Sequence, residues 1–347
     1  MAIYGAGIMI GPIVGPTLGG WLTESFDWRY VFLVNLPFGI MAIFGILAFL
    51  PQSVPKLRRF DFFGFAMLAL AVGSLQLMFD RGQAVGWFES SEIWLYLGLT
   101  ISGLWVFVIH CWTSDNPFID LRMFRDRNFV MGLVFIFIVG LTMFSGLALL
   151  PPLLQNLMGY PVIETGIVMA PRGVGTLLSM IVVGRLVSRV DARVLVATGL
   201  LVTALSLWMM TGFDTQMDSK PIVLSGVIQG FGLGFVFVPL STLTFATIEA
   251  RFRPDATSIF SLVRNVGSGV GISLVMAVLT RMIAVNHEEL GAAITATSPQ
   301  VVQQLPGLLT GSPTIAAVAD GLVSQQAAMI SYNDNFVLMM WLSLSAL

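Results

Sequence analysis

Two arginines stand inside long apolar segments of this sequence, where a charged side chain usually has a compensating partner or a functional role. Arg172 follows Pro171 in MAPRGVGTLLSMIVV, and Arg264 interrupts ATSIFSLVRNVGSGVGISL. A charge at the centre of a bilayer costs at least about 2.5–3.5 kcal/mol, so it normally faces a cavity or a partner. Either arginine is therefore a candidate for a substrate or gating contact. The alternative is an arginine satisfied by backbone carbonyls or by snorkelling to the surface.

Two amides interrupt other apolar segments. Gln229 stands alone in SGVIQGFGLGFVFVPL, and Asn35 directly precedes Leu36-Pro37. An amide in mid-span commonly ties helices together by hydrogen bonds, and the alternative for Gln229 is a position in a binding pocket. For Asn35 the simpler interpretation is that it satisfies backbone that the proline leaves unpaired. Both residues join the two arginines as candidates for a transport pathway or gate.

The residue types that perform enzyme chemistry are sparse. His110 and His287 have no metal-ligand spacing, and the single Cys111 excludes an intramolecular disulfide and a multi-cysteine metal site. The GFGLG run at 230–234 lies in an apolar segment, and neither a G-x-S-x-G nor a P-loop motif occurs. The sequence therefore predicts no enzyme, no metal site and no cofactor.

Composition identifies the environment of these residues. Of the 347 residues, 56% are hydrophobic and only 10% are charged, and the mean hydropathy is +0.88. Soluble proteins contain about 25% charged residues. The chain is therefore predicted to be an all-α, multi-pass protein of the lipid bilayer. The net charge of −2 gives no indication of nucleic-acid binding.

Apolar stretches of spanning length recur along the chain. We expect about nine complete spans and the start of a tenth near Phe336. The segment 281–334, rich in Ala, Gln, Ser and Thr, is expected to be a long loop outside the membrane, with a surface helix over 315–330. The nine spans are expected near 2–22, 30–50, 62–80, 93–112, 129–150, 164–185, 193–213, 221–247 and 257–280.

Basic residues predict the orientation. Alternate loops carry eleven of the lysines and arginines, and the intervening loops carry four. Cytoplasmic loops are enriched in these residues, so the first set faces the cytoplasm and the loop 281–334 faces the outside. The eleven are Lys56, Arg58, Arg59, Arg122, Arg125, Arg127, Arg185, Arg189, Arg193, Arg251 and Arg253.

A glycine pattern in the first span carries a resemblance to a known family. The run GPIVGPTLGGW resembles the antiporter motif of exporters in the major facilitator superfamily, G-x8-G-x3-G-P-x2-G-G, with Ala2 in place of its first glycine. The following FDWRYVFLVNLPFGI resembles the fourteen-span drug:proton antiporters of the EmrB/QacA type. Small residues on one helix face allow a neighbouring backbone to approach closely. The matching residues are Gly11, Gly15, Pro16, Gly19 and Gly20.

A second motif lies in a basic loop. The run GRLVSRVDAR resembles the second-half copy of the superfamily's cytoplasmic loop motif, G-x-L-x-D-R-x-G-R-[RK]. Gly184, Arg189 and Arg193 match, Ser188 replaces the usual aspartate, and Asp191 stands where glycine is usual. These departures leave a gating role and a simple positive-inside anchor equally open.

The resemblance implies a domain organisation. Residues 1–50 would be the last two helices of the N-terminal bundle, 51–128 two extra central spans with their loops, and 129–347 the C-terminal bundle. Four spans of the family would be absent before residue 1, and most of the last span after Leu347. The 347 residues are therefore expected to be an incomplete chain.

The same resemblance implies a function. It is proton-coupled efflux of amphipathic or cationic drugs across a bacterial cytoplasmic (inner) membrane, with small molecules and protons as partners. A periplasmic adaptor and an outer-membrane channel are further partners by analogy. The alternatives are export of a specific metabolite or siderophore, and a membrane fragment that does not transport.

Overall fold

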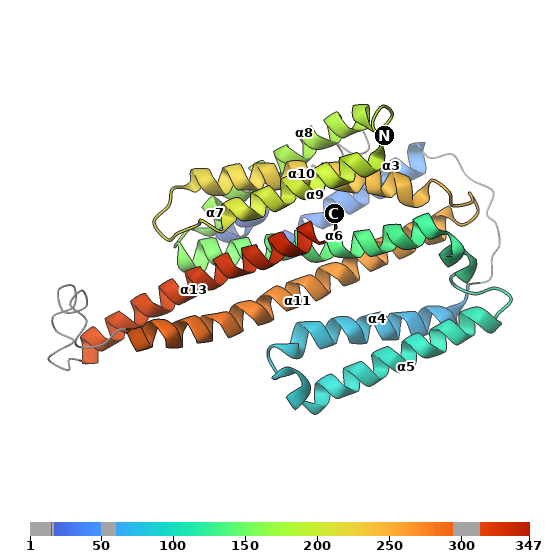
Figure 1. Ribbon diagram of the computed structural model, residues 1–347. Coiled ribbons are helices and arrows are strands. Elements are labelled where there is room, and N and C mark those ends of the chain that lie inside the picture. Colours follow the sequence, from blue (N-terminus) through green and yellow to red (C-terminus); the bar gives the residue numbers. More distant parts are fainter. Residues whose placement is uncertain (1–14, 16, 50–59, 294–312) are drawn as a thin grey trace.

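The computed structural model describes residues 15, 17–49, 60–293 and 313–347, and in these parts the chain forms helices and no strands. A helix over residues 17–25 comes first (Figure 1). The later helices are α2 (Tyr30–Leu33), α3 (Asn35–Phe49), α4 (Phe62–Gly82), α5 (Ser91–Thr113), α6 (Arg127–Pro152), α7 (Val162–Met169), α8 (Pro171–Leu186), α9 (Ala192–Met210), α10 (Ser219–Phe245), α11 (Arg253–Ala293) and α13 (Pro313–Leu344). Short 3₁₀ turns lie at Trp87–Glu89 and Leu121–Arg125, and a π-helical turn at Leu153–Leu157 follows α6.

Eight helical segments in the described part of the chain are long and apolar enough to cross a membrane. They agree with the predicted spans from the second to the ninth, and the protein is a multi-pass membrane protein. The helices from α6 to α13 pack into one bundle, and α4 and α5 form a hairpin beside α11 (Figure 1). Most of the predicted first span and the loop 50–59 lie outside the described residues.

The prediction of a long loop over 281–334 is wrong. Helix α11 continues to Ala293, and α13 already begins at Pro313. The last helix is thus 32 residues long and does not start near Phe336. Hydropathy misses it because its inward face is small and polar: Ala327, Ser331 and Asn335 recur every fourth residue and are fully buried.

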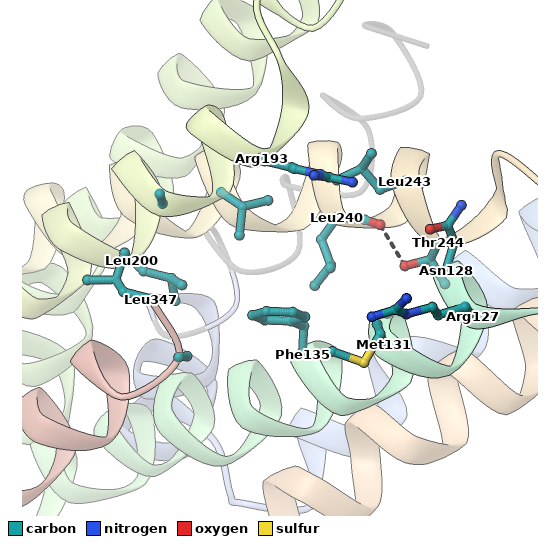
Figure 2. A pocket seen from close by; sticks show the side chains of 14 residues that line it. Arg127, Asn128, Met131, Phe135, Arg193, Leu200, Leu240, Leu243, Thr244 and Leu347 are labelled. Atoms are coloured by element: carbon teal, nitrogen blue, oxygen red, sulfur yellow. Dashed lines mark hydrogen bonds between the residues drawn. The ribbon is translucent and has the colours of Figure 1, made fainter.

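The end of α13 lies beside the middle of α9, where the Ser343 hydroxyl donates to the Leu200 carbonyl at 3.2 Å. A cavity of about 610 Å³ continues from Leu347 between α6, α9 and α10. Figure 2 shows apolar side chains on its walls, among them Phe135 and Leu240, and the guanidinium groups of Arg127 and Arg193 at its border. Ala346 and Leu347, which follow α13, form part of its lining.

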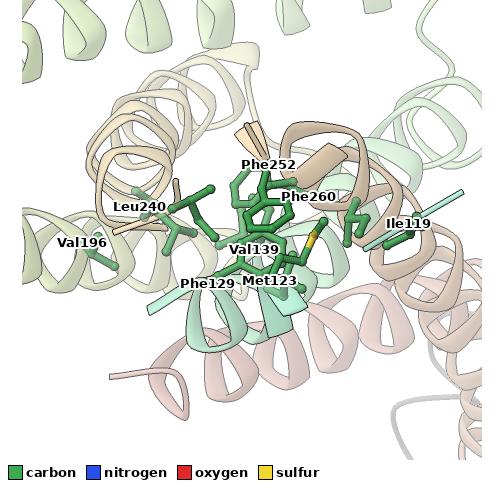
Figure 3. Packing of buried hydrophobic residues seen from close by; sticks show 14 of the residues in the cluster. Ile119, Met123, Phe129, Val139, Val196, Leu240, Phe252 and Phe260 are labelled. Carbon is green, nitrogen blue, oxygen red and sulfur yellow. The ribbon is translucent and has the colours of Figure 1, made fainter. Parts of the chain in front are cut away.

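Close helix packing explains why this bundle is rich in glycine. Helices α6 and α11 approach so closely that a methyl group at Gly267 or Gly271 would overlap the carbonyl oxygens of Phe137 or Leu141. Below these contacts a buried apolar cluster joins α6, α9, α10 and α11, with Phe129 and Phe260 at its centre (Figure 3). Without a hydrophobic force between helices in lipid, such close contact is what holds them together.

The α4–α5 hairpin attaches to this bundle through polar contacts. The Ser273 hydroxyl of α11 donates to the Phe79 carbonyl of α4 at 2.9 Å, and the Gln76 amide lies against Gly269. At the other end of α4, the Asp61 carboxylate accepts hydrogen bonds from the Gly64 N–H, from His110 Nε2 and from the Phe118 N–H, each at 2.9 Å. Asp61 therefore joins the start of α4 to the end of α5.

Replacing Asp61 by alanine is expected to destabilise the chain by about 1–3 kcal/mol, because the substitution removes a helix cap and leaves buried donors unpaired. Burial raises the pKa of the Asp61 carboxyl, but its hydrogen bonds outweigh burial and the pKa lies below its usual value. The contribution of the Asp61 carboxylate to folding stability is thus fully present above its pKa in the unfolded chain, about 3.9. It is lost as the pH falls through the lower pKa of the folded chain. Thermal unfolding at pH 7 should show the loss, whereas Asp115→Ala, at an exposed site in the next loop, should melt like the parent.

The predicted orientation is tested by single cysteines in the loops that precede and follow α5. In a chain whose Cys111 is replaced by serine, a cysteine at Glu89 should react with an impermeant maleimide added outside intact cells. A cysteine at Arg125 should react only after permeabilisation, because its basic loop faces the cytoplasm. Equal labelling of both sites in intact cells would refute the orientation.

Candidate transport site in the helix bundle

Arg172 occupies the second position of α8, directly after Pro171, and α7 runs into α8 through Ala170, whose backbone is also helical. Its Nη2 donates to the Met143 carbonyl of α6 at 3.2 Å. Its Nη1 is buried and has no hydrogen-bond partner in the described structure. A carbonyl therefore satisfies part of the guanidinium, as one interpretation expected, but one buried donor group remains available.

Gln229 of α10 is fully buried, and neither its Nε2 nor its Oε1 has a hydrogen-bond partner among the described residues. Its amide lies against Gly146 of α6, since a methyl group at that glycine would be 3.2 Å from Nε2. The interpretation that Gln229 ties helices together is thus not what the structure shows. A buried polar group without a partner costs about 1–3 kcal/mol, so a ligand, a water molecule or another helix arrangement could stabilise it.

Asn335 is a polar residue of the bundle that the sequence reading missed. Its Nδ2 donates to the Ser331 carbonyl at 2.9 Å, while its Oδ1 is buried and lacks a partner in the described structure. One helical turn further, Met339 lies 3.3 Å from a methyl group built on Gly146, the same glycine that Gln229 contacts. The signal was the four-residue spacing of Ser331 and Asn335, but Ser331 fell in the expected loop and Asn335 directly after it.

Arg172 of α8 and Gln229 of α10 therefore lie against neighbouring residues of α6, Met143 and Gly146, and Asn335 of α13 lies one turn before Met339, which meets the same glycine. We name these three residues the polar centre. Together they present unpaired buried donors and acceptors in the interior of the bundle. Low local dielectric strengthens any hydrogen bond made there. The polar centre could thus bind a polar group strongly or form different internal bonds in a second arrangement.

Arg264 of α11 lies close to this centre along α6. Its carbonyl oxygen faces Gly140, about one turn from Met143. Its guanidinium carbon is 5.8 Å from the centre of the Phe237 ring, and its buried Nε has no hydrogen-bond partner in the described part. The arginine therefore rests on an aromatic face rather than on carbonyls alone.

The antiporter-motif helix contacts α7. The Thr17 hydroxyl donates to the Gly166 carbonyl at 3.3 Å, and a methyl group at Gly20 would be 2.9 Å from the Val162 carbonyl oxygen. Gly15 and Gly19 face open space, so Gly20 is the close contact of the motif in this structure. Gly11 and Pro16 lie outside the described residues.

Replacing Gly20 by valine is expected to push the first helix away from α7 and to cost about 1–3 kcal/mol, as overpacking does in tight interfaces. Gly19→Val is the matched control, because no atom lies within 4 Å of a methyl group built on Gly19. The melting temperature of the purified chain should fall for Gly20→Val and remain unchanged for Gly19→Val. Equal melting of both variants would contradict the contact.

The remaining predicted residues do not converge on the polar centre. Asn35 is exposed, and its Nδ2 donates to the Val31 carbonyl at 3.3 Å, in agreement with a local backbone role. In the cytoplasmic loop motif, Asp191 caps α9 by accepting from the Arg193 N–H at 2.9 Å. Arg189 is exposed, and Gly184 has open space around it. The described residues contain no group of His, Cys, Asp and Glu placed to hold a metal ion.

Comparisons with known proteins agree with this architecture. The family model of the Major Facilitator Superfamily matches residues 1–280. The probable multidrug resistance protein EmrY of Escherichia coli K12 is 32% identical over 345 residues, which are 97% of this chain and 67% of the relative. The multidrug export protein EmrB of the same organism is 29% identical over 350 residues, covering 99% and 67%.

The fatty acid resistance protein FarB of Neisseria gonorrhoeae is 28% identical over 343 residues, covering 97% of this chain and 68% of the relative. The chain thus spans about two thirds of the length of these relatives. The all-helical bundle, the glycine-rich helix contacts and the match over most of the chain lead to one assignment. The chain belongs to the major facilitator superfamily and is of the EmrB type.

Proposed function

We propose that the chain is the transporting part of a proton-coupled exporter of amphipathic and cationic drugs. The multidrug names of EmrY and EmrB support this substrate class. The observation that carries the proposal is the polar centre, whose buried Arg172, Gln229 and Asn335 have unpaired hydrogen-bonding atoms. Polar residues that face a bundle interior within the membrane typically belong to a substrate or ion pathway.

The three residues of the polar centre would act differently. The amide oxygens of Gln229 and Asn335 are acceptors that a cationic drug can use. Arg172 cannot release its proton at working pH, so it would act as a gate rather than as a proton carrier. Its position directly after Pro171 suits this role, because a proline within a spanning helix is a usual place for a kink. No catalytic step is proposed for any of them.

Proton coupling would rest on acidic residues outside the centre of this bundle. Most acids of the described helices lie near helix ends: Asp80 is in the last turn of α4 and Glu164 in the first turn of α7. Asp334, expected in a loop, lies in α13 between Asn333, whose Nδ2 donates to the Phe213 carbonyl, and Asn335, and it is partly buried. We propose that the coupling acids belong to helices that pack against this chain.

The wider setting is also a proposal. A bacterial cytoplasmic membrane would hold the protein, and a periplasmic adaptor with an outer-membrane channel would carry the drug onward. Residues 1–50 would complete the N-terminal bundle, and α4 with α5 would be the two extra helices. The C-terminal bundle would begin near residue 129.

A second candidate substrate is an amphipathic anion. FarB carries the name of a fatty acid resistance protein, and Arg172 Nη1 and Arg264 Nε are buried donors without a partner in the described structure. A carboxylate head group is a good acceptor for such donors. Export of a specific metabolite such as a siderophore is the remaining alternative within transport.

Growth protection discriminates between these substrates. We define the EmrY chimera as EmrY of Escherichia coli in which residues 1–347 of this chain replace the matching two thirds. In a drug-sensitive strain, the chimera should protect cells against ethidium and quaternary ammonium compounds but not against long-chain fatty acids. Protection against fatty acids alone would favour the anion, and protection against neither would refute both substrate classes.

A further inference from the structure

A second cavity, of about 390 Å³, lies at the opposite end of the bundle from the cavity beyond α13. Its walls come from the segment between α6 and α7 and from the loop between α9 and α10. By the basic-residue rule this end faces outside. It is an open, shallow hollow, and its lining is Met158, Gly159, Tyr160, Glu164, Thr215, Gln216 and Met217.

The backbone around this cavity is fixed by its sequence. Pro151 and Pro152 supply no N–H for helical hydrogen bonds, and a π-helical turn follows at Leu153–Leu157. Gly159 then adopts φ +72°, a conformation that glycine accepts without strain. The Tyr160 N–H closes the turn on the Leu154 carbonyl at 2.9 Å. Single-turn π segments of this kind are frequent at functional sites.

Within this mixed lining, Tyr160, Glu164 and the two methionines are the groups that suit an organic cation. An aromatic ring attracts a cation to its face, and two thioethers are soft, adaptable apolar contacts. Glu164 is exposed, and its carboxylate forms no ion pair with any described residue. The adjoining loop adds Asp214, while Asp218 pairs with Lys220 at 3.3 Å. Negative charge therefore predominates around the cavity.

Glu164 also lies on the helix that meets the antiporter-motif helix. The contacts of Gly20 with Val162 and of Thr17 with Gly166 fall on either side of Glu164 in α7. A ligand bound at this carboxylate would thus be held on the helix that packs against the first span.

We propose that this outer cavity binds a hydrophobic organic cation through the Glu164 carboxylate and the Tyr160 ring. The inference deepens the proposed function, because it gives the exported cation a contact on the release side. It also stands alone, because binding can be measured without transport.

The test is equilibrium binding of tetraphenylphosphonium to the purified 347-residue chain in detergent. Glu164→Gln should weaken binding about fivefold, the size of an exposed ion pair. Tyr160→Leu should weaken it about threefold, the size of an exposed cation–π contact. The matched control is Glu89→Gln, an exposed carboxylate at the same end beside Trp87 and Phe88, which should bind like the parent. Tetraphenylborate, the anion of the same shape, should not compete.

Unchanged binding in both Glu164→Gln and Tyr160→Leu would overturn the proposal, as would equal competition by tetraphenylborate. Circular dichroism and melting of each variant show whether the fold is retained. If the EmrY chimera fails to protect cells while the purified chain still binds the cation at this cavity, the transport function is refuted and the binding site stands.

Discussion

Replacing Gly230 by valine is expected to prevent the bundle from folding into a stable, monodisperse protein. Helix α10 passes so close to α8 at this residue that an added methyl group would overlap the Arg172 carbonyl oxygen and would meet Thr176 Oγ1 at 2.9 Å. Both are part of the opposing helix, and a backbone carbonyl cannot rotate away. Overpacking of this kind costs about 1–3 kcal/mol or more, and here it also displaces Arg172 from the polar centre.

Gly184→Val is the matched control for this prediction. Gly184 lies on α8, the helix that Gly230 of α10 meets, but nothing approaches a methyl group built on Gly184. Size-exclusion chromatography and thermal unfolding in detergent should show loss of folded protein for Gly230→Val and parental behaviour for Gly184→Val. Folded Gly230→Val protein of parental stability would contradict the close α8–α10 packing.

Replacing Arg172 by glutamine is expected to reduce ethidium export by the EmrY chimera at least about tenfold, without reducing stability. The buried guanidinium makes one hydrogen bond, to Met143, and has no acidic partner among the described residues. Removing a poorly paired buried charge is commonly neutral or stabilising, because the desolvation cost disappears. If Arg172 acts as a gate, the same substitution should nevertheless reduce transport.

The two measurements together separate function from structure. Arg185→Gln, at the cytoplasmic end of the same helix, removes an equal charge at an exposed position and should keep both export and stability. A variant Arg172→Gln that exports normally, or one that loses export only because it unfolds, would contradict a gating role for this arginine.

Much of the fold follows from the sequence because lipid imposes a simple rule. An apolar stretch of about 20 residues must be a helix that satisfies its own backbone. The rule located the helices from α4 to α10 within a few residues. It failed for α13, whose first two thirds bury Ala327 and Ser331 against neighbouring helices and therefore lack the hydropathy of a lipid-facing span.

The candidate site was predictable only in part, because a polar residue stands out only where its span is recognised as apolar. Arg172 and Gln229 stand out as polar residues in apolar spans, and both lie in the bundle interior. Asn335 was missed together with its helix. The antiporter motif indicated a close helix contact, but nothing lies within 4 Å of a methyl group built on Gly15 or Gly19, and glycine spacing alone does not show which glycine makes the contact. That depends on the crossing of two helices, and here it is Gly20 that meets α7.

Proton-driven export is tested most directly by ethidium efflux from energised cells, measured with and without a protonophore. We predict rapid efflux by the EmrY chimera that the protonophore abolishes. We predict none by the 347-residue chain alone, because no acidic side chain is fully buried in its described helices and Asp334, the acid next to the polar centre, is partly exposed. Efflux by the inserted chimera that ignores the protonophore, or protonophore-sensitive efflux by the 347-residue chain alone, would contradict the proposed division between the polar centre and the coupling acids.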